Sequence, residues 1–247
     1  MIVVMKPGSS KKEVNCVIRQ IERLGFKAHP IFGVTRTVIG AIGDDRDKHL
    51  LQSLAGLSSV EQLVPILQPF KLASREFKPQ ASIIRVKKAV FGGPYFGLIA
   101  GPCTVESERQ LMETAVNVAR AGAKMLRGGA FKPRTSPYSF QGLEEKGLKF
   151  LAKAREKTGL PFVTEVLNPE DVPLVGSYAD VLQIGARNAK NFSLLRRVGK
   201  LGKPVLLKRG PAMTLQEFVM SAEYLPAEGG HKVILCERGM RTFETAT

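Results

Sequence analysis

The sequence predicts an α/β protein in which a small ferredoxin-like α+β domain precedes a TIM-type (β/α) barrel domain. Over roughly the first 70 residues the expected elements run strand, helix, strand, strand, helix, strand. From residue 95 onward strands and helices alternate, which is typical of a parallel sheet. Nearly every strand of this second part ends in a charged or thiol-bearing residue, as strands of a TIM-type barrel do. Six such strands are expected, so the predicted barrel is incomplete, with six of eight strands.

The ferredoxin-like domain is predicted to occupy residues 1–70. It opens with a strand at residues 1–6 and a helix within residues 9–25. Ser10 and Glu13 form a capping-box pattern at the start of this helix, and apolar residues at helical spacing give it one face to bury. Two strands, a second helix and a last strand are then expected at 26–32, 35–43, 47–57 and 60–67.

Residues 71–94 are predicted to form a linker and a short entry hairpin, because proline and glycine interrupt the pattern there. The barrel domain, residues 95–247, follows. Its strands are expected at 95–100, 123–128, 161–166, 180–186, 204–210 and 232–239. Its helices are expected near 107–121, 143–158, 169–178, 191–201 and 214–226. Each strand, helix and following strand then makes one right-handed crossover.

An open dinucleotide-binding sheet is the alternative to a barrel. Such a sheet would need a glycine-rich fingerprint after its first strand. Residues 101–107, with the sequence GPCTVES, contain one glycine and a proline instead. Because functional groups stand at the ends of many strands and not only of the first, the barrel is favoured.

Composition places the chain among ordinary globular proteins, with 247 residues, 44% of them hydrophobic and 24% charged. No run of about 18 apolar residues predicts a membrane span, and the first residues lack the apolar core of a signal peptide. We therefore expect a cytoplasmic location. The three cysteines are scattered along the chain without a C-x-x-C pair, so we expect reduced thiols.

The formal net charge of +15 requires an explanation. Nucleic acid, an anionic membrane and anionic small molecules are the partners that such a charge can serve. Lysine and arginine are not gathered in a tail. Several stand alone where apolar stretches end, as in KMLRGG, QIGARN, LLKRG and ILCERG. This distribution favours phosphorylated metabolites and argues against nucleic acid or a membrane.

The predicted strand ends carry the candidate functional residues. These are Cys103, Arg127, Glu165, Arg187, Lys208 with Arg209, and Glu237 with Arg238. Taken singly, each arginine could be an ordinary surface residue, and Lys208 could extend from a core strand to solvent. Taken together, so many cations at one barrel mouth would repel one another unless a multiply charged anion binds there.

Residues 127–142, with the sequence RGGAFKPRTSPYSFQG, form the richest stretch. Arg127, Lys132 and Arg134 stand here with the hydroxyl of Thr135 on a loop that glycine and proline interrupt. Arginine makes forked contacts with phosphate, and lysine supplies a point charge. An exposed basic loop is the alternative. A second phosphate near Arg187 and Lys208 would suit a reaction that joins two phosphorylated molecules.

Cys103 follows the Gly-Pro pair at the end of the first barrel strand, so its thiol is expected at the barrel mouth. Nearby cations would favour the thiolate, which suits either a nucleophile or a ligand for a divalent metal. A buried, inert thiol is the alternative. Cys16 and Cys236 are expected to serve in packing. The histidines, at positions 29, 49 and 231, are expected to be structural.

Five motifs, in this order after a ferredoxin-like domain, carry a resemblance to a known family. They are GPCTVES, LRGGAFKPRTSPYSFQG, QIGARN, LLKRG and LCERG. The chain resembles, over essentially all its length, the 3-deoxy-D-arabino-heptulosonate 7-phosphate (DAHP) synthases of the class shared with the octulosonate 8-phosphate synthases. KPRTSP discriminates between the two, since it is similar to the erythrose 4-phosphate loop of the DAHP synthases.

The resemblance implies an aldol-type condensation of phosphoenolpyruvate with erythrose 4-phosphate, the first step of the shikimate pathway to the aromatic amino acids. It implies a divalent metal of the Mn, Zn or Fe type, with Cys103 as one ligand. The positions that match phosphoenolpyruvate contacts are Arg127, Lys132, Arg187, Lys208 and Arg238. Those that match erythrose 4-phosphate contacts are Arg134 and Thr135. Lys132 is expected to handle a proton as well.

The resemblance also implies regulation and assembly. The ferredoxin-like domain is similar to allosteric modules that bind Tyr or Phe, and a homo-oligomer associated through residues 1–70 is expected. No nucleic-acid or membrane partner is expected.

The sequence departs from the family at its end. It stops at CERGMRTFETAT, whereas family members continue through two further βα units that supply a His, a Glu and an Asp to the metal. We therefore expect a truncated chain whose remaining metal ligands lie beyond Thr247. Two other functions stay open, an octulosonate 8-phosphate synthase and a non-catalytic regulatory or assembly module.

Overall fold

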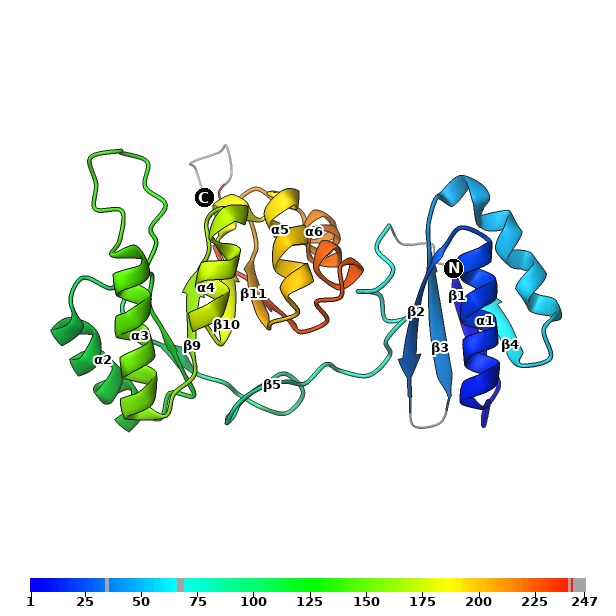
Figure 1. Cartoon of the computed structure of the whole chain (residues 1–247), viewed down its shortest axis with the longest axis horizontal. Coiled ribbons are helices and arrows are strands. Elements are labelled where there is room, and N and C mark those ends of the chain that lie inside the picture. Colours follow the sequence, from blue (N-terminus) through cyan, green and yellow to red (C-terminus); the bar gives the residue numbers. More distant parts are fainter. Residues whose placement is uncertain (34–35, 66–68, 240, 242–247) are drawn as a thin grey trace. The chain divides into compact units, whose positions relative to one another are not determined.

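The computed structural model divides the chain into two compact units, Met1–Gln80 and Ala81–Thr247 (Figure 1). It describes all residues except 34–35, 66–68, 240 and 242–247. Of the expected strands, position 35 and positions 66–67 lie outside the described residues. The division groups residues 71–80 of the expected linker with the first unit and the entry hairpin with the second. The domain boundaries expected from the sequence stay a prediction.

The first unit is a four-stranded antiparallel sheet with helices on one face. Its elements are β1 (Ile2–Met5), α1 (Lys11–Arg23), β2 (Lys27–Phe32), β3 (Thr37–Ile42), the 3-10 helix η1 (Asp45–Gly56) and β4 (Val60–Val64). The strand order is β2-β3-β1-β4, with β1 pairing with both β3 and β4. This confirms the ferredoxin-like fold, although η1 is a 3-10 helix where a second α-helix was expected.

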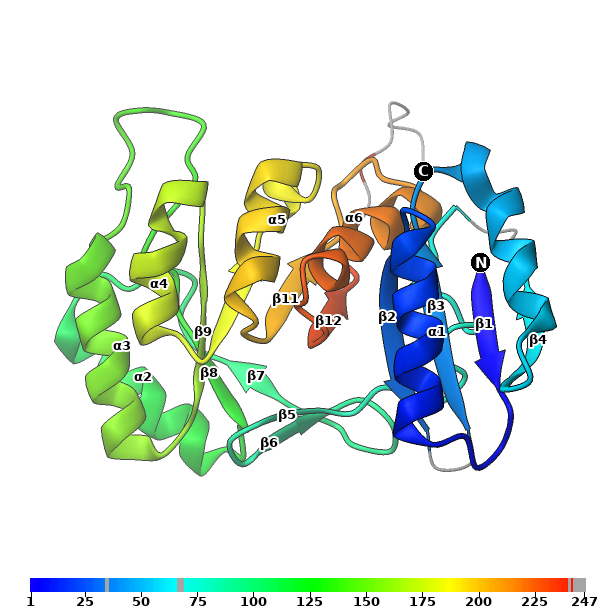
Figure 2. The same ribbon diagram turned by 45° about the vertical axis from the view of Figure 1, so that its right-hand side comes forward.

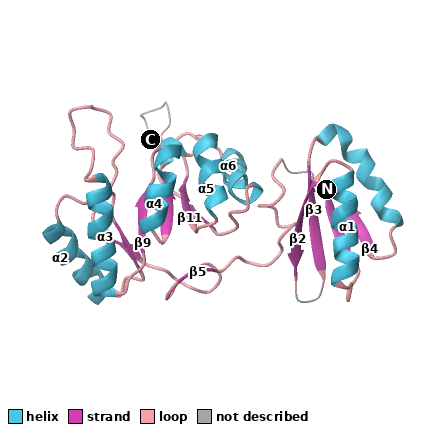
Figure 3. Ribbon diagram, in the orientation of Figure 1, coloured by secondary structure: helices cyan, strands magenta, loops and turns pink. Residues whose placement is uncertain are grey.

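The helical face of this sheet forms its own core. The capping box at the start of α1 is present, with the Ser10 backbone N–H donating to Glu13 Oε2 over 2.7 Å. The helix α1 lies alongside the sheet (Figure 3). Side chains of α1 and η1 pack on those of the strands. The fully buried members of this core include Val14, Val17, Ile21, Leu51, Leu54, Val3, Met5 and Ile39.

The opposite face of the sheet is covered by the segment after β4. Ile2 alternates with the core residue Val3, so it points to this face, and it is paired in register with Gly40 of β3. A Cβ at Gly40 would lie 2.5 Å from the ring of Phe77, so that ring packs directly on the backbone of β3. Phe77 and Leu72 are buried. The apolar face of the sheet is thereby closed by residues that the sequence assigned to a linker.

The second unit alternates strands and helices as expected. It begins with the hairpin β5 (Ile84–Val86) and β6 (Ala89–Phe91) and continues with β7 (Ile99–Ala100), α2 (Glu108–Arg120), β8 (Met125–Arg127), α3 (Glu144–Thr158), β9 (Phe162–Glu165), η2 (Pro169–Asp171), α4 (Val172–Tyr178), β10 (Val181–Ile184), η3 (Ala186–Asn188), α5 (Phe192–Leu201), β11 (Val205–Lys208), α6 (Leu215–Ala227) and β12 (Val233–Cys236). The strand expected at 95–100 is shorter, since only its last two residues pair with β8.

Strands β7 to β12 form one parallel sheet in sequential order, and α2 to α6 follow one another along its outer face (Figure 2). Each neighbouring pair of strands is parallel. This confirms the prediction of six parallel strands of a (β/α) barrel. No helix among the described residues is long and apolar enough to cross a membrane.

Side-chain alternation divides each barrel strand between two faces. Leu126, Phe162, Leu182 and Leu207 pack against the helices. Their neighbours Met125, Val163, Val181 and Leu206 face inward, where they pack against Ile84, Val86, Ala89 and Phe91 of the hairpin. Two residues further along each strand the inward positions are Arg127, Glu165, Gln183 and Lys208. The inner face is therefore apolar near the strand starts and polar near the strand ends.

Candidate active site

A cavity of about 430 Å³ lies where the parallel strands end. Its walls come from the loop after β8, from the ends of β9, β10 and β11, and from the segments that follow β10, β11 and β12. The lining residues are Lys132, Pro133, Arg134, Glu165, Gln183, Gly185, Ala186, Arg187, Lys208, Pro211, Arg238 and Arg241.

Positive charge dominates this cavity. Of its described lining residues six are lysine or arginine, and Glu165 is the one carboxylate. So many cations around one cavity repel one another when it holds only water, and a ligand with several negative charges removes that repulsion. The cavity is therefore suited to a phosphorylated or carboxylated small molecule.

The structure brings together five of the eight residues expected at the site, namely Lys132, Arg134, Arg187, Lys208 and Arg238. The other three, Cys103, Arg127 and Thr135, are not among the residues that line the cavity. Sequence reasoning noted Glu165 at its strand end without placing it in the site, and it missed Gln183 and Arg241 altogether. Gln183 could have been found from side-chain alternation, because it is an inward-facing position near the end of its strand, as Lys208 is in the next strand. No sequence pattern near Arg241 indicates that it would line the cavity.

Glu165 holds its carboxylate on the polar inner face of the sheet. Gln183 Nε2 donates to Glu165 Oε2 over 3.0 Å. A Cβ at position 185 would lie 2.0 Å from Glu165 Oε1, so a larger residue there would displace this carboxylate from its present position. Burial raises the pKa of Glu165, and the charges of Lys132 and Lys208 only partly oppose this. The carboxyl group can therefore take up or release a proton inside the cavity.

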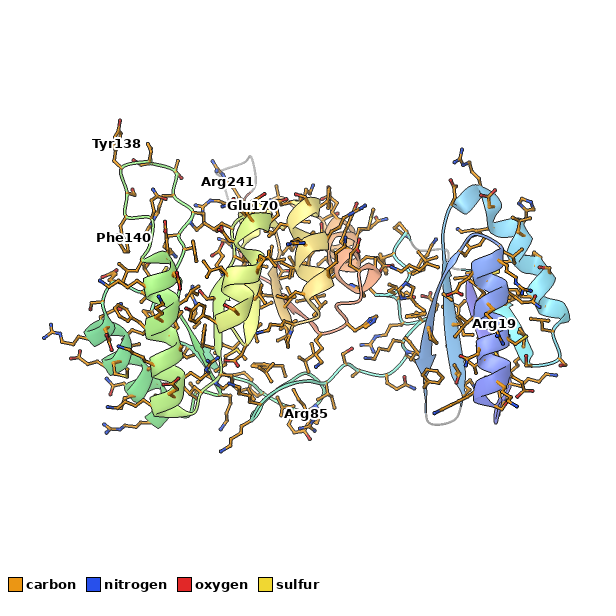
Figure 4. The ribbon with its side chains drawn as sticks, in the orientation of Figure 1. Arg19, Arg85, Tyr138, Phe140, Glu170 and Arg241 are labelled. Carbon is orange, nitrogen blue, oxygen red and sulfur yellow. The ribbon has the colours of Figure 1, made fainter. Side chains whose placement is uncertain are left out.

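The loop after β8 carries Arg134 to the cavity and is closed at its base. The Lys132 backbone N–H donates to the Gln141 carbonyl over 2.8 Å, and Arg134 Nε donates to the Phe140 carbonyl over 3.0 Å. Arg187 Nη1 donates to the Pro133 carbonyl over 3.4 Å, which ties this loop to the end of β10. The loop extends away from the helices, with Tyr138 near its tip and 97% exposed (Figure 4).

Cys103 stands behind Lys132. Lys132 Nζ lies 3.3 Å from Cys103 Sγ and 3.1 Å from the Cys103 carbonyl oxygen. The hydrogen bond from Lys132 lowers the pKa of the thiol; the charges of Lys132 and Arg127 act in the same direction, and burial opposes them. A Cβ at Gly129 would lie 2.9 Å from the same carbonyl, so glycine permits this close approach. The thiol is exposed and not buried among apolar side chains, which disfavours an inert packing role.

The other two cysteines differ in their surroundings. Cys236 packs against the interior cluster below the cavity, as expected. Cys16 is exposed, so the expectation that it serves in packing is wrong. It lies between the buried positions Val14 and Val17 of α1 but on the other side of the helix.

The described residues do not form a complete metal site. Among them no group of three or more His, Cys, Asp or Glu side chains is placed to hold one ion. Cys103 offers one soft donor, but its charged neighbours are Lys132 and Arg127, which are cations. Because catalytic metal sites normally take three or more protein ligands, the residues present do not fit a resident metal by themselves.

Fold and site together define a (β/α)-barrel protein with a ferredoxin-like domain and a cavity lined by lysine and arginine at the carboxyl ends of its strands. Residues 81–247 match the model of the DAHP synthetase I family, and residues 1–68 match that of the DAHP synthase ferredoxin-like domain. The chain belongs to the DAHP synthetase I family. The resemblance read from its motifs is thereby confirmed.

Two aldolases are among the proteins whose sequences are similar to this chain. The chain is 53% identical over 247 residues to the phospho-2-dehydro-3-deoxyheptonate aldolase of Thermotoga maritima, a match that covers 100% of this chain and 73% of that protein. It is 35% identical over 153 residues to a 2-dehydro-3-deoxyphosphooctonate aldolase of Acidithiobacillus ferrooxidans, covering 59% of this chain and 54% of that protein.

Solved structures agree with these matches. The crystal structure of the Thermotoga maritima phospho-2-dehydro-3-deoxyheptonate aldolase (DAHP synthase) superposes with a TM-score of 0.71 at 52% identity, covering 100% of this chain and 72% of that one. A truncated form of 3-deoxy-D-arabino-heptulosonate 7-phosphate synthase from the same organism has a TM-score of 0.65 at 50% identity, covering 72% of this chain and 64% of that one. The relatives are thus longer than the part of them that this chain matches.

Proposed function

We propose that this chain carries the substrate-binding part of a DAHP synthase. The reaction condenses phosphoenolpyruvate with erythrose 4-phosphate and water to give DAHP and inorganic phosphate. The observation that carries the proposal is the cavity of about 430 Å³ lined by six cations at the carboxyl ends of the barrel strands. The 53% identity to the Thermotoga maritima aldolase supports it over the whole length of the chain.

In this proposal each substrate is bound by its own set of residues. Arg127, Lys132, Arg187, Lys208 and Arg238 hold the carboxylate and phosphate of phosphoenolpyruvate. Arg134 and Thr135, on the loop after β8, hold erythrose 4-phosphate. The hydrogen bond from Arg187 to the Pro133 carbonyl supports adjacent sites, because it joins the two sets of residues. Arg127 is near enough to Glu165 for its charge to lower the pKa of that carboxyl, but it is not among the residues that line the cavity. Its proposed part in holding phosphoenolpyruvate is therefore the attraction of its charge across the cavity wall.

The chemistry follows from holding the two substrates in reach of each other. C3 of phosphoenolpyruvate bonds to the aldehyde carbon of erythrose 4-phosphate, and water bonds to C2, where positive charge develops. The aldehyde oxygen takes a proton, for which Lys132 is the proposed donor, and the first proton of the attacking water goes back to Lys132. Phosphate then leaves from C2 with the second proton of the water, and C2 becomes a carbonyl carbon. The cations that held the phosphate also stabilise the charge on the leaving group.

This chain offers one proposed ligand for a divalent metal. The family resemblance implies such a metal, and Cys103, whose pKa is lowered by Lys132, is the proposed thiolate ligand. Among the described residues no group of three or more His, Cys, Asp or Glu side chains completes such a site. The steps above describe only what residues of this chain do. When bound, the metal would supply a Lewis acid for the aldehyde oxygen.

Regulation and assembly are proposed for the ferredoxin-like unit. Tyr or Phe is the expected effector, and a homo-oligomer associated through residues 1–70 is the expected assembly. Calorimetric titration of each amino acid into the folded chain, beside light scattering for its mass, tests both. If neither amino acid gave a heat of binding, the proposal of an amino-acid effector would be wrong. If the measured mass were that of a monomer, the proposed association through residues 1–70 would be wrong.

Octulosonate 8-phosphate synthesis is the second candidate, since relatives at 35% identity are 2-dehydro-3-deoxyphosphooctonate aldolases. The KPRTSP loop argues against it. The test is calorimetry of the full chain with phosphoenolpyruvate and, once that is bound, with erythrose 4-phosphate or arabinose 5-phosphate. Tight binding of erythrose 4-phosphate is expected. Preference for arabinose 5-phosphate would favour the second candidate, and binding of neither substrate would favour a non-catalytic module.

A further inference from the structure

A buried guanidinium lies next to the β11–β12 wall of the cavity, by which we mean the end of β11 and the segments that follow β11 and β12. Arg209 follows the cavity residue Lys208, and only 7% of its surface is exposed. Its Nε and Nη2 both donate to the carbonyl oxygen of Met213, the Nε bond being 2.8 Å long. Its Nη1 donates to Glu237 Oε2 over 2.8 Å. Arg209 therefore joins the turn after β11 to the segment after β12.

Glu237 completes this connection on the other side. Its second oxygen, Oε1, accepts from the backbone N–H of Arg238 over 2.9 Å. The hydrogen bond from Arg209 lowers the pKa of Glu237, and the N–H of Arg238 lowers it further. The carboxylate of Glu237 therefore stays charged. It accepts from the guanidinium of Arg209 and from the backbone N–H of Arg238, which lines the cavity.

Four cavity residues depend on these two segments. Lys208 precedes Arg209, Pro211 lies within the turn that Arg209 closes on Met213, and Arg238 follows Glu237. The backbone N–H of Arg241, the residue labelled in Figure 4, donates to the Pro211 carbonyl over 3.0 Å. Arg209 and Glu237 themselves are not among the residues that line the cavity.

Repulsion between the cations of this wall favours a pair of residues that holds their backbone in place. Lys208, Arg238 and Arg241 converge on one cavity and repel one another, so their backbone must be held against spreading. Because Glu237 is 56% exposed on its side chain, its ion pair contributes little to global stability. Its effect is local, since a cation displaced by about 1 Å loses much of its contact with a bound anion.

We propose that Arg209 and Glu237 form a positioning pair that fixes the β11–β12 wall of the cavity and thereby sets its affinity for phosphoenolpyruvate. The second half of this statement rests on the proposed function. The pair does not touch the substrate. It acts through Lys208, Pro211, Arg238 and Arg241, whose backbone it anchors.

The test uses the full chain, three single variants, a double variant of Glu237→Ala with Arg209→Lys, and a control variant. Glu237→Ala removes both hydrogen bonds of the carboxylate, and Glu237→Gln is the milder change that keeps the fold. Arg209→Lys keeps the charge but loses the fork that reaches Met213 and Glu237 together. Glu108→Ala is the matched control. Glu108, on α2, makes an ion pair of the same 2.8 Å length with Lys153, and it does not line the cavity.

Calorimetric titration with phosphoenolpyruvate is the first measurement. We expect Glu237→Ala and Arg209→Lys each to weaken binding about 10-fold, the lower end of the effect of residues that orient ligands, with melting temperatures near that of Glu108→Ala. The double variant should lose no more than the larger single loss, because the two residues act as one unit. Affinities equal to that of the control would overturn the proposal.

Hydrogen exchange of the ligand-free chain is the second measurement, and it does not depend on the substrate. The amides of residues 208–213 and 236–239 should exchange faster in Glu237→Ala than in Glu108→Ala. Unchanged exchange would overturn the positioning role. If the unaltered chain bound no phosphoenolpyruvate, the proposed function would fall, and the exchange experiment alone would decide whether the pair holds the wall.

Discussion

At the scale of single residues, the cations of the cavity are the groups on which the proposed substrate binding depends. We expect Arg187→Ala and Lys208→Ala to weaken phosphoenolpyruvate binding and Arg134→Ala to weaken erythrose 4-phosphate binding. Each loss of a charge-assisted contact should cost about 1.5–3 kcal/mol, or roughly 10- to 150-fold in the dissociation constant. Calorimetry with each substrate measures this.

Lys190→Ala is the control for these variants. Lys190 pairs with Glu217 and does not line the cavity, so its removal should change neither affinity. An equal loss for both substrates in all three cavity variants would contradict the division of roles.

Glu165 makes the stability of the chain depend on pH in a definite direction. Burial raises its pKa, so folding favours the protonated carboxyl. This contribution is fully present below the pKa of the unfolded chain, about 4.3, and is lost as the pH rises through the raised pKa. Relative to Glu165→Gln, the unaltered chain should therefore lose stability as the pH rises.

Urea unfolding of both chains from about pH 4 to about pH 8 measures this difference. The free energies of unfolding should be close at the acidic end and should diverge toward neutral pH. A constant difference across the range would mean that Glu165 keeps its ordinary pKa.

At the scale of elements, Asp180 fastens the β5–β6 hairpin to the strand starts. Lys87 Nζ lies 2.8 Å from Asp180 Oδ1, and Arg155 Nη1 lies 3.3 Å from Oδ2, which also accepts from the Phe162 backbone N–H over 3.0 Å. Burial alone would raise the pKa of Asp180. The hydrogen bonds from Lys87 and Phe162 and the charge of Arg155 outweigh it, so the pKa lies below its ordinary value.

We expect Asp180→Asn to lower the free energy of unfolding by about 1–3 kcal/mol near neutral pH, because the amide leaves these donors partly unpaired. A lowered pKa gives stability that is present above the ordinary aspartate value, about 3.9, and lost as the pH falls through the lowered one. The cost of the substitution should therefore shrink in acid.

Urea unfolding near pH 7 and near pH 3 checks this, with Glu156→Gln on the exposed side of α3 as the control. A cost that did not change between the two pH values would show that Asp180 is not held in its charged form by the network.

At the scale of the whole molecule, we expect turnover to require the proposed metal. Among the described residues Cys103 belongs to no group of three or more His, Cys, Asp or Glu side chains that could hold a metal ion. We therefore expect the 247-residue chain to release no phosphate from the two substrates, with or without added manganese or zinc. A chimaera continued with the C-terminal segment of the Thermotoga maritima relative should be active.

Cys103→Ser should abolish the activity of that chimaera, because a hydroxyl stays protonated near neutral pH and is a poor ligand. Cys16→Ser, at an exposed position of α1, is the matched control and should leave activity unchanged. Metal-dependent turnover by the 247-residue chain alone would contradict the role assigned to Cys103.

Local sequence was sufficient for most of the elements and for the strand ends. Hydrophobic period, the capping box at Ser10 and the glycines that end helices act within a few positions of the chain, so they can be recognised without the fold. The same reasoning placed Lys208 and Arg187 at strand ends, and both line the cavity. It failed for η1 and for Cys16, where spacing alone does not say how the helix turns or which side is buried.

Contacts between distant segments decided the rest. Gln183 and Arg241 line the cavity, and Arg209 lies behind its wall, because the parallel sheet brings three strand ends together. Phe77 closes the second face of the ferredoxin-like sheet because Gly40, far from it in sequence, leaves room for its ring. Such pairings depend on packing and on charges that meet only after the chain has folded, so no short stretch of sequence carries them.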